Sequence, residues 1–299
     1  MIKGLALTPP VIGRISIGRV VEKNGKRLPE KDDQFTLTTQ VQTREGWLHH
    51  PLDAQLREAA EGNKLRSLPV QLLFNDPTLN LQASYTRFDR ELGRPQCVGN
   101  GEQCKRLGDQ GLETLPCPTP RFCPLALQGA CKPYGRLYVS LGEDGDLGTF
   151  IFRTTGYNSI RTLMTRMNYY RAFSNNRLAC LPLSLRLRGK STTQSHRAPI
   201  YYVDLTLREG LNMKSALIEA MALEQQRLEQ GYDQAALDEA ARQGFAQGDF
   251  EESEEELPAI LEEFYPEAAN HQEEAQTAPI ATDSLSDKLG ARVAGLEKD

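Results

Sequence analysis

The chain has 299 residues, of which 39% are hydrophobic, a composition that allows one large domain or two smaller ones. No stretch approaches the roughly 20 consecutive apolar residues of a membrane span. The first residues also lack the continuous apolar run of a secretory signal. These features argue against a membrane protein and a secreted protein, and we expect a cytoplasmic one.

The net charge of −5 conceals an uneven distribution along the chain. Residues 244–287 contain 13 Asp or Glu and no Lys or Arg, whereas residues 1–243 contain 32 basic and 25 acidic residues, a difference of +7. The acid-rich part has too few apolar residues to offset the entropy of ordering it. We therefore expect a positively charged folded body and a disordered acidic tail over 248–299.

The first part of the chain, over 1–96, is predicted to be rich in β-strands. Apolar residues that alternate with polar or small ones indicate strands, and clusters of Asn, Asp and Pro indicate the turns between them. The expected elements are strands over 12–21 and 35–41, a short helix near 52–61, and strands over 70–74 and 81–88. The last of these strands leads directly into a cysteine-rich segment.

Five of the six cysteines lie in that segment, over 97–132. In a reducing cytoplasm, grouped thiols are more often metal ligands than disulfides, and four thiolates satisfy the tetrahedral preference of Zn²⁺. The spacing lacks the paired C-x-x-C knuckles of the most specific zinc motifs, so buried free thiols with one disulfide stay an open alternative. The predicted zinc ligands of this insertion are Cys97, Cys117, Cys123 and Cys131, with Cys104 as an alternate.

The following part, over 133–210, is predicted to be a basic α+β part packed with the first, and 211–247 to hold C-terminal helices. The expected elements are strands over 135–141 and 148–154, a helix over 158–173, strands over 180–188 and 200–207, and helices over 212–230 and 233–245. The strand over 180–188 alternates leucines with arginines, so one face meets a core and the other meets something anionic. The sequence thus predicts an α+β fold with a mainly antiparallel sheet, a cysteine zinc-binding loop, C-terminal helices and a disordered tail.

Residues 147–203 form a stretch of 57 positions without Asp or Glu, in which arginines are interleaved with aromatic residues. Arginine forks grip phosphates and aromatic rings stack on bases, so the stretch favours DNA or RNA binding. The alternative is a solvated face whose arginines pair with the acidic tail or with carboxylates elsewhere. The predicted nucleic-acid-binding residues are Arg153, Arg161, Arg166, Tyr169, Tyr170, Arg171, Arg186, Arg188, Lys190 and Arg197.

Catalytic motifs are weak. The run Gly-Lys-Ser-Thr at 189–192 resembles the end of a phosphate-binding loop, but Ser184 stands where that loop needs glycine and a strand follows instead of a helix. His49, His50 and Asp53 could bind a metal or form a surface turn. No spacing indicates a nucleophile with a base and an orienting acid, and we expect a protein that is not an enzyme.

The tail contains one apolar island among its glutamates, over 257–265. Such a segment can fold onto a partner, with Leu261 and Phe264 as the candidate partner-binding residues. Two alternatives stay open: a mimic of nucleic acid that occupies the basic face of the same chain, and a tail that only increases solubility.

Several short runs together resemble a known family. They are Cys-Pro at 117–118 and 123–124, Gly-Ala-Cys-Lys-Pro-Tyr-Gly-Arg-Leu at 129–137, and Thr-Thr-Gly-Tyr-Asn-Ser-Ile at 154–160. This pattern resembles the recombination directionality factors of phages with large serine integrases. It is also similar to their relatives in integrative elements and prophages, which are often labelled hydrolases or metal-binding proteins. The resemblance covers roughly 1–207 and leaves the acidic C-terminal region outside.

The resemblance implies a cytoplasmic mobile-element protein with zinc on its clustered cysteines. In the phage branch, the factor binds the integrase and redirects it from integration to excision. The leading expectation is therefore a non-enzymatic zinc protein that acts in DNA recombination by contacting a recombinase and DNA. The alternative is a single-stranded DNA-binding or DNA-processing accessory protein, and a third hypothesis is a metal-dependent nuclease that uses His49, His50 or Asp53.

Overall fold

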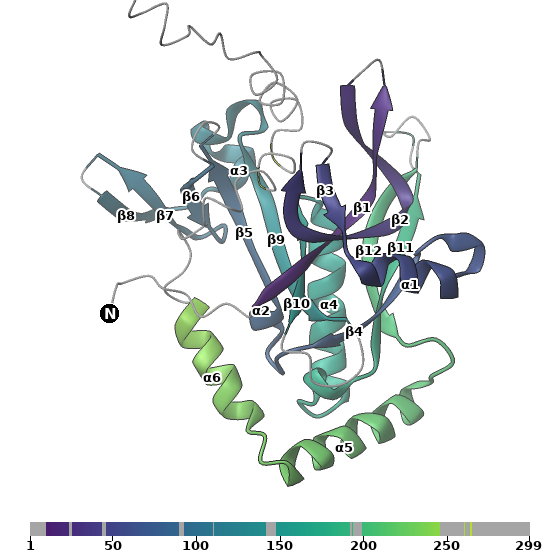
Figure 1. The fold of residues 1–299 in the computed structure, drawn as a ribbon. Helices are drawn as coiled ribbons and strands as arrows, with labels where there is room; N and C mark the ends of the chain where they lie inside the picture. The colour runs from purple at the N-terminus through teal and green to yellow at the C-terminus, as the bar shows by residue number, and fades with distance from the viewer. Residues whose placement is uncertain are drawn as a thin grey trace, which may run out of the picture.

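The computed structural model describes residues 10–23, 26–43, 46–89, 93–109, 111–141, 148–191, 193, 199–245, 260 and 264. These residues form a branched 12-stranded sheet with α-helices packed against it (Figure 1). The predicted α+β class, the mostly antiparallel sheet and the C-terminal helices are confirmed. The predicted tail lies outside the described residues except for Ile260 and Phe264.

The elements follow the predicted order closely. The strands are β1 (Val11–Lys23), β2 (Lys26–Thr43), β3 (Gly46–His49), β4 (Ser67–Leu72), β5 (Leu81–Phe88), β6 (Pro95–Gly99), β7 (Gln103–Gly108), β8 (Gly111–Pro116), β9 (Cys131–Ser140), β10 (Thr149–Thr154), β11 (Leu183–Lys190) and β12 (Ile200–Leu207). The helices are α1 (Pro51–Ala59), α2 (Pro77–Asn80), α3 (Thr119–Phe122), α4 (Tyr157–Phe173), α5 (Met213–Glu229) and α6 (Gln234–Phe245). Short 3₁₀ turns are η1 (Glu61–Asn63), η2 (Pro124–Gly129) and η3 (Leu178–Cys180).

The main path of the sheet runs in the order β3-β2-β1-β10-β9-β5-β6-β7-β8. Within it, β1 pairs with β10 in parallel, and the other neighbours pair antiparallel. Strand β4 branches from β9 and continues to β11 and β12. This branch curves back toward β2, where the Phe35 amide donates to the carbonyl of Leu65 at 2.7 Å. The sheet therefore wraps around a core instead of lying flat.

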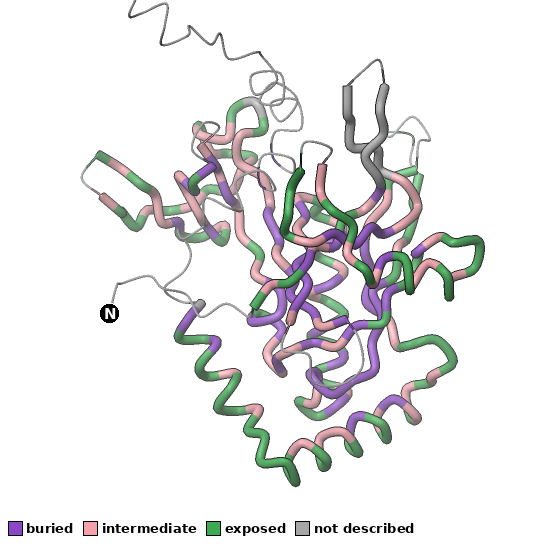
Figure 2. Tube along the Cα trace, viewed as in Figure 1, coloured by how far each residue is buried: buried purple, intermediate pink, exposed green. Residues whose placement is uncertain are grey.

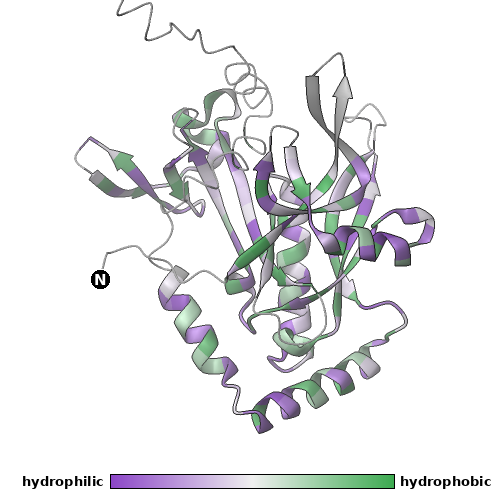
Figure 3. Ribbon diagram, viewed as in Figure 1, coloured by the Kyte–Doolittle hydropathy of each residue, from purple (hydrophilic) through white to green (hydrophobic). Residues whose placement is uncertain are grey.

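The core lies between the curved sheet and α4. Buried positions gather there in Figure 2, and the same region is hydrophobic in Figure 3. The predicted apolar face of α4 is confirmed, because Ile160, Leu163 and Met167 are buried. Gly135 on β9 allows α4 to approach closely, since a Cβ at that position would lie 2.9 Å from Cγ1 of Ile160. Helix α4 is thus fixed against β9, the strand that leads away from the cysteines.

The C-terminal helices start at well-defined caps. The Asn212 side chain accepts from the Ser215 amide, and the Ser215 hydroxyl accepts from the Asn212 amide, both at 3.0 Å, which forms a capping box at the start of α5. Ala216 and Ala220 bury one face of α5 against the core. Helices α5 and α6 then follow one edge of the body (Figure 1).

The structure differs from the expected fold in two places. The cysteine segment is not a bare loop, because it forms strands β6, β7 and β8, which extend the sheet as a meander. Strands β4 and β5, which lie on either side of the turn at 75–77, do not pair with each other; both pair with β9. Three of the five clustered cysteines consequently lie on strands, Cys97 on β6, Cys104 on β7 and Cys131 on β9.

Candidate functional site

Two of the clustered cysteines are aligned across neighbouring strands. Cys131 on β9 lies directly opposite Arg87 on β5, and Arg87 lies directly opposite Cys97 on β6. Because directly paired residues project from the same face of a sheet, the thiols of Cys97 and Cys131 point to one side, with Arg87 between them. Pairing continues from Cys97 to Arg106 on β7. The cysteines therefore share their face with two guanidinium groups.

Gly99 brings two further cysteines to the same face. It pairs with Cys104 on β7, and it is two residues from Cys97, so their side-chain directions coincide. A Cβ at Gly99 would lie 2.7 Å from Cβ of Cys104 and 2.9 Å from Sγ of Cys117. The missing side chain thus provides the space in which the Cys117 thiol lies.

The segment with α3 and η2 covers this face and supplies Cys123. Arg87 Nη1 donates to the Leu125 carbonyl at 3.3 Å, which ties the segment to β5. Burial, together with the charges of Cys97, Cys123 and Cys117, raises the pKa of Cys131 to about 12. Burial also raises the pKa of Cys104 to about 11, with the hydrogen bond of its thiol to Cys97 as the next cause. Five cysteines are therefore electrostatic neighbours, and we call them the cysteine cluster: Cys97, Cys104, Cys117, Cys123 and Cys131.

The cysteine cluster suits Zn²⁺ by its donor chemistry. All of its thiols are free and not in disulfides. A bound metal would replace the thiol protons, and its positive charge would offset the thiolate charges that raise one another's pKa. As they stand, no three His, Cys, Asp or Glu side chains within the described part of the chain are arranged as a metal site. Zinc binding therefore stays a prediction. Cys180, the sixth cysteine, is buried in the core, and burial raises the pKa of its thiol.

A separate cluster of basic residues lies where α4 meets the β11–β12 hairpin. Asp204 on β12 is 4% exposed. Its carboxylate accepts from Nε of Arg166 on α4 at 3.1 Å and from Nε of Arg188 on β11 at 3.4 Å. The hydrogen bond to Asp204 raises the pKa of Arg166. One carboxylate thus holds two arginines from different elements. For Arg166 and Arg188, the alternative in which the arginines pair with carboxylates of the same chain is therefore observed.

The remaining predicted basic and aromatic residues divide into three groups. Four are exposed on the same two elements and, together with Arg166 and Arg188, form what we call the basic face: Arg161 and Tyr169 on α4, and Arg186 and Lys190 on β11. Arg171 lies at the end of α4 and donates to Oδ1 of Asn176 at 2.9 Å.

Besides Arg171, three predicted residues lie outside the basic face. Tyr170 is buried in the core, with its hydroxyl 3.5 Å from the Leu205 carbonyl, so it has no ring face free for a base. Arg153 on β10 pairs with Arg136 on β9, and strand alternation places both on the side of the sheet away from α4. Arg197 lies outside the described residues.

The histidine motif has the contacts of a helix start. Nδ1 of His50 accepts from the Leu52 amide at 3.2 Å and caps α1. Asp53 is buried and accepts from the Leu37 amide at 2.8 Å and from Nε of Arg57 at 2.6 Å. Burial lowers the pKa of His50. These contacts tie α1 to β2, which favours the structural interpretation of the motif over a metal site.

Comparison with protein families identifies the chain. The family model described as Gp3-like, recombination directionality factor-like, matches residues 12–208, about two thirds of the sequence. The chain belongs to this Gp3-like family. The match confirms the family that the sequence motifs indicated, and it includes the cysteine cluster and the described basic face. Neither the curated proteins nor the solved structures gave a match. 

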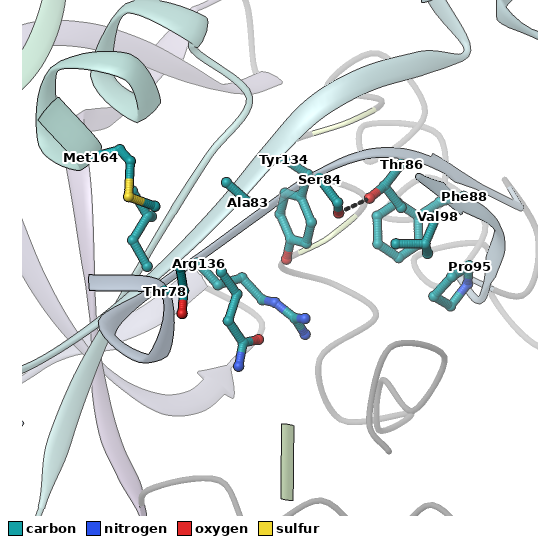
Figure 4. Close-up of a pocket in the computed structure, with 12 residues that line it drawn as sticks. Thr78, Ala83, Ser84, Thr86, Phe88, Pro95, Val98, Tyr134, Arg136 and Met164 are labelled. Carbon is teal, nitrogen blue, oxygen red and sulfur yellow. Dashed lines mark hydrogen bonds between the residues drawn. The ribbon is translucent and has the colours of Figure 1, made fainter. Parts of the chain in front are cut away.

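Outside the cysteine cluster and the basic face, the family domain contains a groove that sequence reasoning missed. It has a volume of about 260 Å³ and follows β5, β6 and β9, with Tyr134 between Phe88 and Arg136 (Figure 4). At one end, Phe88 and Tyr134 pack with Ile260 and Phe264 from the C-terminal region. Each of these four apolar residues is visible in the sequence, but nothing in the sequence shows that they meet.

None of the helices within the described residues combines the length and apolarity that a membrane crossing requires.

Proposed function

We propose that this protein is a non-enzymatic recombination directionality factor that contacts a recombinase and DNA. The observation that carries the proposal is the family match over 12–208. The basic face supports the DNA contact, because Arg186, Arg188 and Lys190 line one strand beside the exposed arginines of α4. Phosphate contacts of this kind position a protein on a duplex without reading its sequence. Selection of the DNA site would then come from the recombinase.

We also propose that the cysteine cluster holds one Zn²⁺. Cys97, Cys117, Cys123 and Cys131 would supply the four thiolates, with Cys104 as the alternate ligand. When bound, the ion would act as a structural cross-link. Such a cross-link would fix the η2 segment to β6 and β9, which otherwise depends on few contacts such as that of Arg87 with Leu125. The surface formed by this segment would become rigid enough to recognise a protein partner.

The test is a recombination assay with the serine integrase of the same mobile element. One DNA substrate carries the pair of sites used for integration, and another carries the two junction sites that integration produces. We expect the full chain to promote strand exchange between the junction sites and to inhibit the integration reaction. No change in either reaction, together with no association with the integrase, would contradict the proposal.

DNA binding and DNA cleavage measurements, made beside this assay, separate the other hypotheses. Exposed Tyr169 on the basic face could stack on an unpaired base, which favours the single-stranded DNA accessory protein as the second candidate. Binding to single strands in preference to duplex, without any effect on the integrase, would support it. Cleavage of labelled DNA without integrase, abolished by a chelator, would support the nuclease.

A further inference from the structure

The C-terminal region returns to the body at an aromatic site formed by Phe88 and Tyr134. The ring centroid of Phe264 lies 4.6 Å from that of Phe88 and 5.2 Å from that of Tyr134, and both pairs are edge-to-face. Ile260 completes the cluster, and Ile260 and Phe264 are 0% and 1% exposed. Edge-to-face packing of three rings is specific in geometry. This contact is therefore a defined docking arrangement.

A polar contact fixes the orientation of the docked segment. Nζ of Lys132 donates to the backbone carbonyl of Phe264 at 2.8 Å and lies 5.9 Å from the centre of its ring. A lysine that binds a late carbonyl is typical of a helix C-terminus. Pro266 follows in the sequence, and proline cannot continue a helix. The positive charge of Lys132 also matches a segment whose sequence is rich in Glu.

The aromatic site lies on the face of the sheet opposite the cysteine cluster. Cys131 and Lys132 are neighbours on β9, and neighbouring residues of a strand project to opposite faces. The groove extends from the aromatic site along β5 past Thr86 and Arg136 toward Met164 (Figure 4). The site is thus distinct from the proposed metal centre and is continuous with a groove.

We propose that the aromatic site is a docking site for a short acidic helix with apolar residues four positions apart, and that Ile260 and Phe264 of the same chain occupy it as a latch. Residues four apart share one face of a helix, as Ile260 and Phe264 do here with their helical backbone. Only 14 residues separate the end of α6 from Ile260. Such a short connection gives the tethered segment an effective concentration of about millimolar at the site. A contact made by two side chains then holds within the same chain. A helix of the same chemistry that binds more tightly can still displace it.

The latch is tested with a fluorescent peptide of residues 254–268 added to the full chain. In wild type the tethered segment competes with the peptide, whereas the I260A/F264A variant leaves the site open. We expect the variant to bind the peptide at least about tenfold more tightly than wild type does, because competition at millimolar effective concentration is removed. A peptide with Ala at the position of Phe264 is the matched control and should not bind.

Two acceptor variants, made in the I260A/F264A background, locate the site. Phe88→Ala should abolish peptide binding, and Lys132→Glu should weaken it by charge repulsion without removing a buried ring. Circular dichroism checks that each variant is folded, and Lys132→Glu, which removes no buried ring, keeps the test valid if Phe88→Ala does not fold. Equal peptide binding by wild type and I260A/F264A would overturn the latch. A wild-type dimer that Phe264→Ala converts to monomer would overturn it too, since the segment would then dock between two copies.

Discussion

Gly99 is the residue on which the geometry of the cysteine cluster depends most directly. Any side chain there would overlap Cβ of Cys104, Sγ of Cys117 and the Gln103 carbonyl, the last at 3.0 Å. Two of these contacts involve atoms close to the backbone, which cannot move without shifting β7. We expect Gly99→Ala to destabilise the fold by about 1–3 kcal/mol, as overpacking does, and to make the Cys117 thiol more reactive.

The measurement for Gly99→Ala is denaturant unfolding combined with thiol labelling of the folded protein. Gly189→Ala is the matched control, because Gly189 is an exposed strand residue whose added Cβ would only reach ordinary contact with Tyr201 at 3.5 Å. That variant should change the free energy of unfolding little. Equal effects of the two substitutions would show that Gly99 is not needed for the cluster.

At the scale of elements, the sequence predicts a strand or helix well where one face is buried and the other is not. Helix α4 and strand β11 show this, because their apolar residues repeat at 3.6 and at 2 positions and meet the core at those positions. Strands β7 and β8 project from the body, and most of their residues are at least partly exposed. Without a buried face there is no apolar alternation. The sequence therefore indicated that the cysteines group together, but it did not indicate the strands that position them.

The aromatic site was missed for a different reason. Lys132 and Phe264 are separated by 132 positions, and each of the two segments has an ordinary local sequence. The apolar island around Phe264 was predicted to bind a partner, but the described contacts of Phe264 are with its own chain. Leu261, the other residue of that prediction, lies outside the described residues. Local patterns cannot show which surface covers an apolar segment.

The η2 segment is the element whose order should depend most on metal. Elemental analysis of protein prepared under reducing conditions should give about one Zn²⁺ per chain. Removing it with a chelator, or substituting Cys123→Ser, should speed tryptic cleavage after Arg121, which is exposed in α3. The hairpin of β11 and β12 should keep its resistance, because it is anchored in the core.

Cys180→Ser is the control for the metal experiment. Cys180 is buried apart from the cluster in η3, so this variant should lose some stability and keep its metal. Zinc-free protein in which the thiols of Cys97, Cys117, Cys123 and Cys131 react freely while folded would contradict the proposed site. A metal content halved equally by Cys180→Ser and Cys123→Ser would do the same.

At the scale of the whole molecule, charge is divided between body and C-terminal region. The part before residue 244 has a net charge of +7, and the acidic residues that reverse it are concentrated in 244–287. Within the body, Arg177 pairs with Glu224 at 2.6 Å and Arg242 with Glu239. On the basic face, the carboxylate that offsets Arg166 and Arg188 within the described residues is that of Asp204. Two arginines share this one carboxylate, so the basic face keeps an excess of positive charge.

Substituting Arg186→Ala and Arg188→Ala together should weaken DNA binding by the full chain equally for all sequences, as loss of phosphate contacts does. If both arginines contact phosphates, the slope of log affinity against log salt should fall by roughly 1.8, since each contact contributes about 0.9 on B-DNA. Fluorescence anisotropy across a salt series measures this slope. The variant Arg177→Ala with Arg242→Ala removes the same charge outside the basic face and should keep the wild-type slope, because counterion release depends on which cations touch the phosphates. If both pairs lowered the slope equally, affinity would depend on net charge alone and the basic face would not be the DNA-binding surface.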